Sequence, residues 1–164
     1  MNWDNYLLEN KSPVGSHAHL GILDGTVQAP FDLSELAVDT RFLSISTPLK
    51  KFKRNYSNLS HLRGNTSIEA ITLNDIDAER VDVFATLPNL KYLHISNNQQ
   101  DEIPDLSALL TLEVLILANI KKVDNIDFIK GLKTLKTLYI YGINQLYDLA
   151  PIASLPHLKE LMER

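Results

Sequence analysis

The sequence predicts an α/β-class solenoid, a curved coil of short repeats with a parallel sheet along its concave face. One observation is an apolar pattern that returns every 22 or 23 residues, and another is the apolar alternation that opens each unit. The third is a second apolar series with a spacing of three. Alternation is typical of a short strand, whereas a spacing of three favours short 3₁₀-helical or irregular returns.

The repeat register is defined by one aliphatic residue that opens each unit. In the unit that opens at Leu112, Leu115 and Leu117 follow at the inward positions of a strand. The opening residues are separated by 22, 22, 23 and 23 positions and are Ile68, Leu90, Leu112, Leu135 and Leu158. A single unit cannot bury its apolar edge, so roughly six such repeats must stabilise one another by stacking.

We expect residues 1–164 to form a single domain, since a chain of this length can bury one sizeable core. Residues 68–164 hold the regular repeats, the last of them incomplete, and residues 17–67 hold degenerate ones. The degenerate strands are centred on Leu20, Ile22, Leu43 and Ile45. Residues 1–16 are the expected N-terminal cap, because solenoids need their ends covered. A short helix there, with partner binding as its alternative role, would have an apolar face of Trp3, Tyr6, Leu7 and Leu8.

These repeats resemble the leucine-rich-repeat family. The stretch LYIYGINQLYDLAPIASLPHLKEL, residues 138–161, is similar to the short repeats of bacterial internalin-type proteins and to the irregular repeats of plant immune receptors. The resemblance is strong over residues 68–161 and weak over residues 17–67. It implies a horseshoe-like fold that binds its ligand on the concave sheet face.

The chain departs from the family pattern at the ninth position of the repeat. The family usually has asparagine there, where the side-chain amide satisfies backbone groups of the turn. Here only Asn98 matches, and the equivalent places are taken by Ile76, Ile120 and Ile143. We therefore expect backbone groups or water to satisfy the turns, and a less regular curve.

Side chains between the inward leucines should point to the concave surface, because neighbours along a strand alternate between its two faces. The predicted cross-strand ladders are Ala70, Tyr92, Val114, Thr137, then Thr72, His94, Ile116, Tyr139, then Asn74, Ser96, Ala118, Tyr141. Tyrosine is enriched at interfaces, although aromatic residues are also simply common in sheets. We predict an exposed partner-binding patch made of Tyr92, His94, Val114, Ile116, Tyr139 and Tyr141.

Charged residues form two further patterns. A ladder of alternating charge should make structural ion pairs worth about 0.2–1 kcal/mol each, and its members are Glu69, Lys91, Glu113 and Lys136. A basic run near Arg63 is expected to be a solvated loop, with contact to an acidic partner or phosphate as the alternative. This run is formed by Lys50, Lys51, Lys53 and Arg54.

Composition excludes several classes of protein. The formal net charge of −4 argues against general nucleic-acid binding, which requires a basic surface. The chain has no cysteine, so neither disulfides nor thiolate metal sites can form.

No basic segment followed by a long apolar run opens the chain, and no apolar stretch approaches the ~20 residues of a membrane span. We expect a cytoplasmic protein, with leaderless export as the alternative.

Motifs for chemistry are weak. His17 and His19 would share one strand face, but no third metal ligand accompanies them. The series Asp75, Asp77 and Glu79 lacks the glycine and distal glutamate of a calcium loop. The sequence contains no phosphate-binding loop and no nucleophile elbow. We predict no cofactor, no metal site and no enzymatic activity, and we consider an enzyme with a site in the concavity the weakest alternative.

The predicted function is non-catalytic protein recognition through the concave face. The alternative is a recognition fragment of a larger receptor or secreted effector whose activity lies beyond Arg164. No polar cap follows the repeat that opens at Leu158, which favours a truncated protein or a contact with another chain. Because exposed sheet edges invite pairing, a homodimer through this edge is a further hypothesis.

Overall fold

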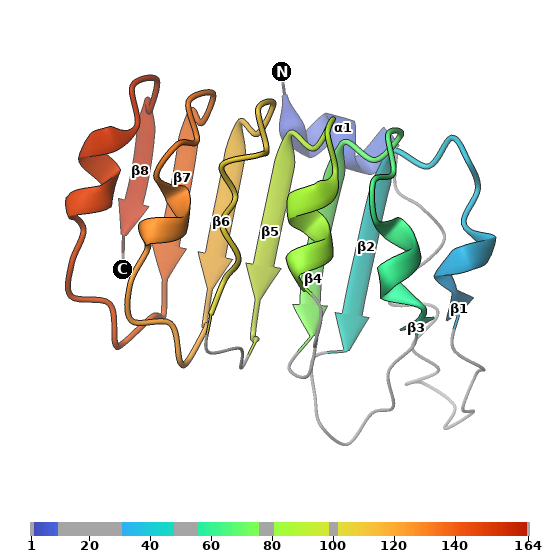
Figure 1. Cartoon of the computed structure of the whole chain (residues 1–164), viewed down its shortest axis with the longest axis horizontal. Helices are drawn as coiled ribbons and strands as arrows, with labels where there is room; N and C mark the ends of the chain where they lie inside the picture. The colour runs from blue at the N-terminus through green and yellow to red at the C-terminus, as the bar shows by residue number, and fades with distance from the viewer. Residues whose placement is uncertain (1, 10–30, 48–55, 76–80, 99–101, 164) are drawn as a thin grey trace.

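The computed structural model describes residues 2–9, 31–47, 56–75, 81–98 and 102–163, and its main feature is a parallel sheet (Figure 1). The sheet has six strands in the order β2-β4-β5-β6-β7-β8. These strands are β2 (Phe42–Thr47), β4 (Ala70–Asp75), β5 (Tyr92–Ser96), β6 (Val114–Ala118), β7 (Thr137–Tyr141) and β8 (Glu160–Glu163). A separate two-stranded sheet pairs β1 (Phe31–Asp32) with β3 (Tyr56–Ser57).

The strand register confirms the predicted repeat. Leu115 pairs with Leu93 on one side and with Leu138 on the other, so equivalent residues of successive units lie side by side. The opening residues Ile68, Leu90, Leu112 and Leu135 are all fully buried. Of the degenerate strands, the one around Leu43 is β2, and the one at Leu20 lies outside the described residues.

The core lies between the sheet and the return segments, most of which are short 3₁₀ helices as predicted. These are η2 (Leu33–Glu35), η3 (Leu59–Leu62), η4 (Val81–Thr86), η5 (Asp127–Ile129) and η6 (Ala150–Ser154). The return between β5 and β6 is irregular where it is described, but it also buries apolar residues three apart, at Ile103, Leu106 and Leu109. The returns therefore supply the apolar wall against which the inward side chains of the strands pack.

The turns after the strands are made by the eighth position of the repeat. Asn97, Asn119 and Gly142 have φ angles of 54°, 52° and 66°, in the left-handed region that asparagine and glycine tolerate best. The ninth position holds the buried side chains of Asn98, Ile120 and Ile143. Backbone bonds satisfy these turns as expected, since the amides of Asn97 and Asn119 each donate over 2.9 Å to a carbonyl of the next strand.

A ladder of asparagine side chains, which was not among the predicted features, crosses the same turns. Asn97 Nδ2 donates to Asn74 Oδ1 over 2.8 Å, and Asn119 Nδ2 donates to Asn97 Oδ1 over 3.2 Å. Asn97 and Asn119 occupy the eighth position of successive units, whereas Asn74 occupies the seventh position of the unit before them. This ladder ties neighbouring coils together where the family pattern would use the ninth position.

The predicted ladder of alternating charge is also present. Lys91 Nζ lies 3.2 Å from Glu69 Oε1, and Lys136 Nζ lies 3.1 Å from Glu113 Oε2. All four side chains are partly exposed, so each pair contributes only about 0.2–1 kcal/mol. Arg63 pairs with Asp82 over 3.0 Å, whereas the basic run that precedes it lies outside the described residues.

The N-terminal helix α1 (Trp3–Glu9) forms as predicted but does not take the position of a terminal cap. Trp3, Tyr6 and Leu7 pack against one residue from each of four neighbouring strands, namely Phe42, Ala70, Tyr92 and Val114. In Figure 1 the helix lies behind the strands, on the face opposite the 3₁₀ returns. The helix therefore crosses the concave sheet face, because the apolar surface that can bury its aromatic residues lies there rather than at the end of the coil.

Candidate functional site

All three predicted ladders exist on the concave face. Tyr92 pairs with Val114, His94 with Ile116, and the ladders continue to Thr137, Tyr139 and Tyr141 on β7. The register extends them further than predicted, to Phe42 on β2 and Met162 on β8. Sequence reasoning therefore placed the six candidate residues correctly on one surface.

The exposure of this surface differs from the prediction, because α1 covers part of it. Only 8% of Tyr92 and 6% of Val114 is exposed, so neither belongs to an open patch. The Trp3 ring lies 5.3 Å from the Tyr92 ring and 5.3 Å from the Tyr6 ring, within the range of favourable aromatic contacts. Burial raises the pKa of Tyr92 to about 12. The sequence alone does not predict this cover, because no local pattern gives the distant surface on which a helix packs.

A polar contact fixes the register of α1 on the sheet. The Tyr6 hydroxyl donates a hydrogen bond to the Glu69 carboxylate, which also forms the ion pair with Lys91. The bond from Tyr6 holds the pKa of Glu69 below its ordinary value, and Lys91 acts in the same direction. Burial and the same hydrogen bond raise the pKa of Tyr6. The pair is therefore most stable with the carboxylate charged and the phenol protonated.

The C-terminal part of the concave face remains open. Tyr141 and Met162 are 36% and 41% exposed, and Ile116 and Tyr139 are half-buried. The Tyr139 hydroxyl donates to Glu160 Oε2 over 3.2 Å, which orients the ring on β7. These four residues, called the open patch below, combine apolar area with hydroxyl groups on adjacent strands.

His94 is the one candidate for acid–base chemistry among the six residues. Its Nε2 atom is buried and has no hydrogen-bond partner among the described residues. Its neighbours in register are Thr72 and Ile116, so no carboxylate on an adjacent strand orients the ring. Burial lowers the pKa of His94, which favours a neutral imidazole. His94 is therefore packed among uncharged side chains of the neighbouring strands.

The buried histidine makes the stability of the fold dependent on pH. As the pH drops below about 6.5, the ordinary histidine pKa, the unfolded chain binds a proton that the folded chain accepts only at lower pH. We therefore expect the free energy of unfolding to fall across this range, and to fall less steeply in His94→Leu. Urea titrations at a series of pH values measure the free energy of unfolding of both proteins. Plotted against pH, the curves of the wild type and of His94→Leu should be parallel above about pH 7.5. Equal slopes below that value would contradict the assignment to His94.

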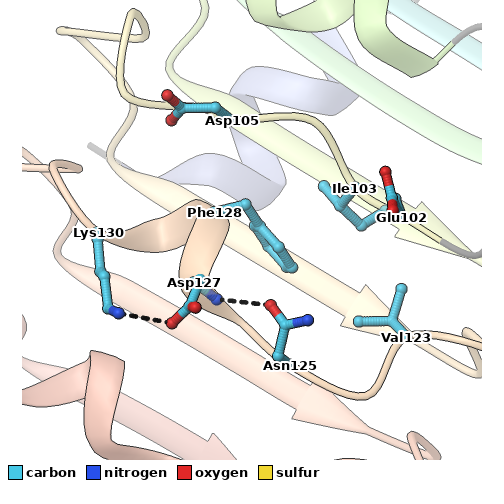
Figure 2. Close-up of a pocket in the computed structure, with 8 residues that line it drawn as sticks. All are labelled: Glu102, Ile103, Asp105, Val123, Asn125, Asp127, Phe128 and Lys130. Carbon is cyan, nitrogen blue, oxygen red and sulfur yellow. Dashed lines mark hydrogen bonds and ion pairs between the residues drawn. The ribbon is translucent and has the colours of Figure 1, made fainter.

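A pocket of about 390 Å³ lies among the returns, away from the concave face (Figure 2). It is lined by Glu102, Ile103, Asp105, Val123, Asn125, Asp127, Phe128 and Lys130. Lys130 Nζ lies 2.7 Å from Asp127 Oδ1, and Asp105 accepts hydrogen bonds from the backbone and hydroxyl of Ser107. Both aspartates are thus already paired within the protein.

The described residues carry neither a cluster of metal ligands nor a membrane-spanning helix. The described ranges contain no group of three or more histidine, aspartate or glutamate side chains placed to hold a metal ion. They also contain no helix long and apolar enough to cross a bilayer. The motif His17 and His19 lies outside these ranges, as do Asp77 and Glu79.

Stacked parallel strands joined by short 3₁₀ returns every 22 or 23 residues define this fold as a leucine-rich-repeat solenoid. Among solved structures it is similar to internalin C2 of Listeria monocytogenes, with a TM-score of 0.56 and 24% identity over 66% of this chain and 47% of that chain. Another similar structure is the internalin InlF of the same organism, with a TM-score of 0.37 and 20% identity over 76% of this chain and 48% of that one. The chain thus spans about half the length of these internalins. No protein-family model and no curated protein matches it.

Proposed function

We propose that this protein is a non-catalytic recognition module that binds a protein partner on its concave face. The open patch carries the proposal, because Ile116, Tyr139, Tyr141 and Met162 leave apolar and aromatic area uncovered on three adjacent strands. Tyrosine and methionine are enriched in protein interfaces, and contiguous exposed apolar area marks binding sites on soluble proteins. The ladder geometry presents these side chains on one rigid surface, which lowers the entropic cost of binding.

The polar groups on the concave face favour binding over catalysis. The imidazole of His94 lies between a threonine and an isoleucine in register. The Glu160 carboxylate accepts a hydrogen bond from Tyr139. Neither arrangement supplies an activated nucleophile with an oriented base. A protein partner fits the open patch better than a small molecule does, because the patch is spread along the sheet.

The test compares two variants, one that lacks a tyrosine of the open patch and one that lacks a tyrosine outside it. Partners are captured from a lysate of the native organism, identified by mass spectrometry, and titrated by calorimetry against each variant. We expect Tyr139→Ala to weaken binding by about 2 kcal/mol, or roughly 30-fold, as for an interface anchor. The control is Tyr147→Ala, because Tyr147 is 88% exposed and lies in the return after β7.

The control variant should bind as the wild type does. An unchanged affinity of Tyr139→Ala, with its circular dichroism spectrum intact, would remove the open patch from the binding site. Equal losses in both variants would show that the effect does not depend on the concave face.

A further inference from the structure

We propose that the concave face over β2, β4, β5 and β6 is a helix-binding surface, and that its partner presents an amphipathic helix in place of α1. The proposal rests on the proposed function, since it names the chemistry of the partner at the same face. The surface, called the helix seat below, consists of Phe42, Ala70, Tyr92 and Val114. In this structure α1 occupies the helix seat as a ligand from the same chain.

The residues of the helix seat form a row that runs across the strands, and α1 lies along this row in Figure 1. Ala70 is fully buried and lies in register between Phe42 and Tyr92 on the neighbouring strands, and Tyr92 pairs with Val114 on the next strand. Strands lie about 4.8 Å apart, so the row is about 14 Å long, of which a seven-residue helix spans about 10 Å. The small side chain of Ala70 allows the helix to approach the sheet between the two aromatic residues.

Helix α1 is a weak occupant of the helix seat. It has seven residues, none of them fully buried, and Leu8 is 76% exposed. Isolated helices shorter than about 12–15 residues are marginal in water, so α1 depends on the sheet for its structure. A partner helix of several more turns would bury the same area and also reach the open patch, which α1 leaves uncovered. Such a helix has more contact area than α1 and can displace it.

The contacts of α1 define the sequence pattern of the partner helix. Trp3 places an aromatic ring on Tyr92, and Tyr6, three residues later, donates a hydrogen bond to Glu69. Leu7 adds an aliphatic contact four residues after Trp3. We therefore expect an aromatic anchor at position i, a hydrogen-bond donor such as tyrosine or arginine at i+3, and an aliphatic residue at i+4. This spacing places all three side chains on one helical face.

The first measurement is the tryptophan fluorescence of the intact protein. Its signal comes from Trp3 alone, because Trp3 is the single tryptophan of the chain. Its fluorescence reports whether α1 is seated, through the emission wavelength and the quenching by acrylamide. Ala70→Arg should displace the helix, because the long charged side chain would occupy the space that α1 takes above β4. The emission of Trp3 should then shift to the red and its quenching should increase. The matched control is Thr137→Arg, because Thr137 occupies the same ladder position one strand beyond Val114.

The second measurement tests binding in trans. The 164-residue chain carrying Trp3→Ala and Leu7→Asp keeps the helix seat but disables α1. The probe is a fluorescein-labelled peptide of residues 2–9, held helical by a hydrocarbon staple that replaces the exposed Asn5 and Glu9. We expect the disabled protein to bind this peptide at least ~10-fold more tightly than the wild type, because a tethered helix competes at millimolar effective concentration. Adding Ala70→Arg to the disabled protein should abolish binding.

Two outcomes would overturn the inference. One is a disabled protein that is folded by circular dichroism yet binds the helical peptide no more tightly than the wild type does. The other is Trp3 emission that responds equally to Ala70→Arg and Thr137→Arg. Either result leaves the proposed function standing if Tyr139→Ala still weakens the captured partner. Peptide binding without any Tyr139 effect would support the helix seat and remove the open patch from the proposal.

Discussion

Replacing Leu115 by alanine is expected to lower the free energy of unfolding by about 3 kcal/mol, the middle of the range for a buried leucine that loses its side chain. Leu115 is fully buried on the central strand β6, between Leu93 and Leu138 in register. Its neighbours above and below belong to other coils, so the sheet cannot collapse around the cavity without shifting whole repeats. Urea denaturation followed by circular dichroism measures the change.

The matched control for this prediction is Leu161→Ala. Leu161 is the same residue at the same repeat position, since it pairs with Leu138 on the side away from Leu115. It lies on the edge strand β8 and is 49% exposed, so its truncation should cost less than about 1 kcal/mol. Similar losses in the two variants would mean that repeat position, and not burial by neighbouring coils, determines the cost.

Replacing Gly142 by alanine is expected to cost about 2–3 kcal/mol, which combines left-handed strain with a steric clash. Gly142 has a φ angle of 66°, a conformation that L side chains rarely adopt. A Cβ atom there would lie 2.1 Å from Asn119 Oδ1 and 3.3 Å from the Asn119 backbone nitrogen. The Asn119 side chain would have to move, and its hydrogen bond to Asn97 would be strained or lost. Thermal and urea unfolding both report the loss.

The Gly64→Ala variant separates the left-handed backbone strain from the steric clash. Gly64 has a φ angle of 71°, and a Cβ atom there would have nothing within 4 Å. It should therefore show the backbone strain alone, about 1 kcal/mol. The excess cost of Gly142→Ala over Gly64→Ala then measures the clash with the asparagine ladder. An excess near zero would show that Asn119 rearranges freely and that the ladder contributes little to stability.

The stacking of the repeats could be predicted from the sequence because it depends on periodicity. Leu93, Leu115 and Leu138 fall at equal spacings, and a residue at a fixed place in a stacked unit meets its equivalent in the next. The cross-strand ladders follow from the same register and from the alternation of side chains along a strand. The charge ladder was predictable for this reason too, and the ion pairs of Lys91 and Lys136 confirm it.

The turn chemistry was only half predictable. The family resemblance directed attention to the ninth position, where Ile120 is buried. The eighth position, Asn97 and Asn119, carries the left-handed turns, and this shift depends on backbone geometry that a list of residues does not contain. Once the φ angles are known, asparagine and glycine at these places are explained by their tolerance of the left-handed region.

The exposure of the predicted binding surface was decided by tertiary structure alone. Local sequence shows that Trp3, Tyr6 and Leu7 share a helical face, but it does not show which distant surface will bury them. Hydrophobic burial is non-directional, so an amphipathic helix packs wherever the complementary apolar area is available. Here that area is the row of Phe42, Ala70, Tyr92 and Val114, which exists only after the coils have stacked.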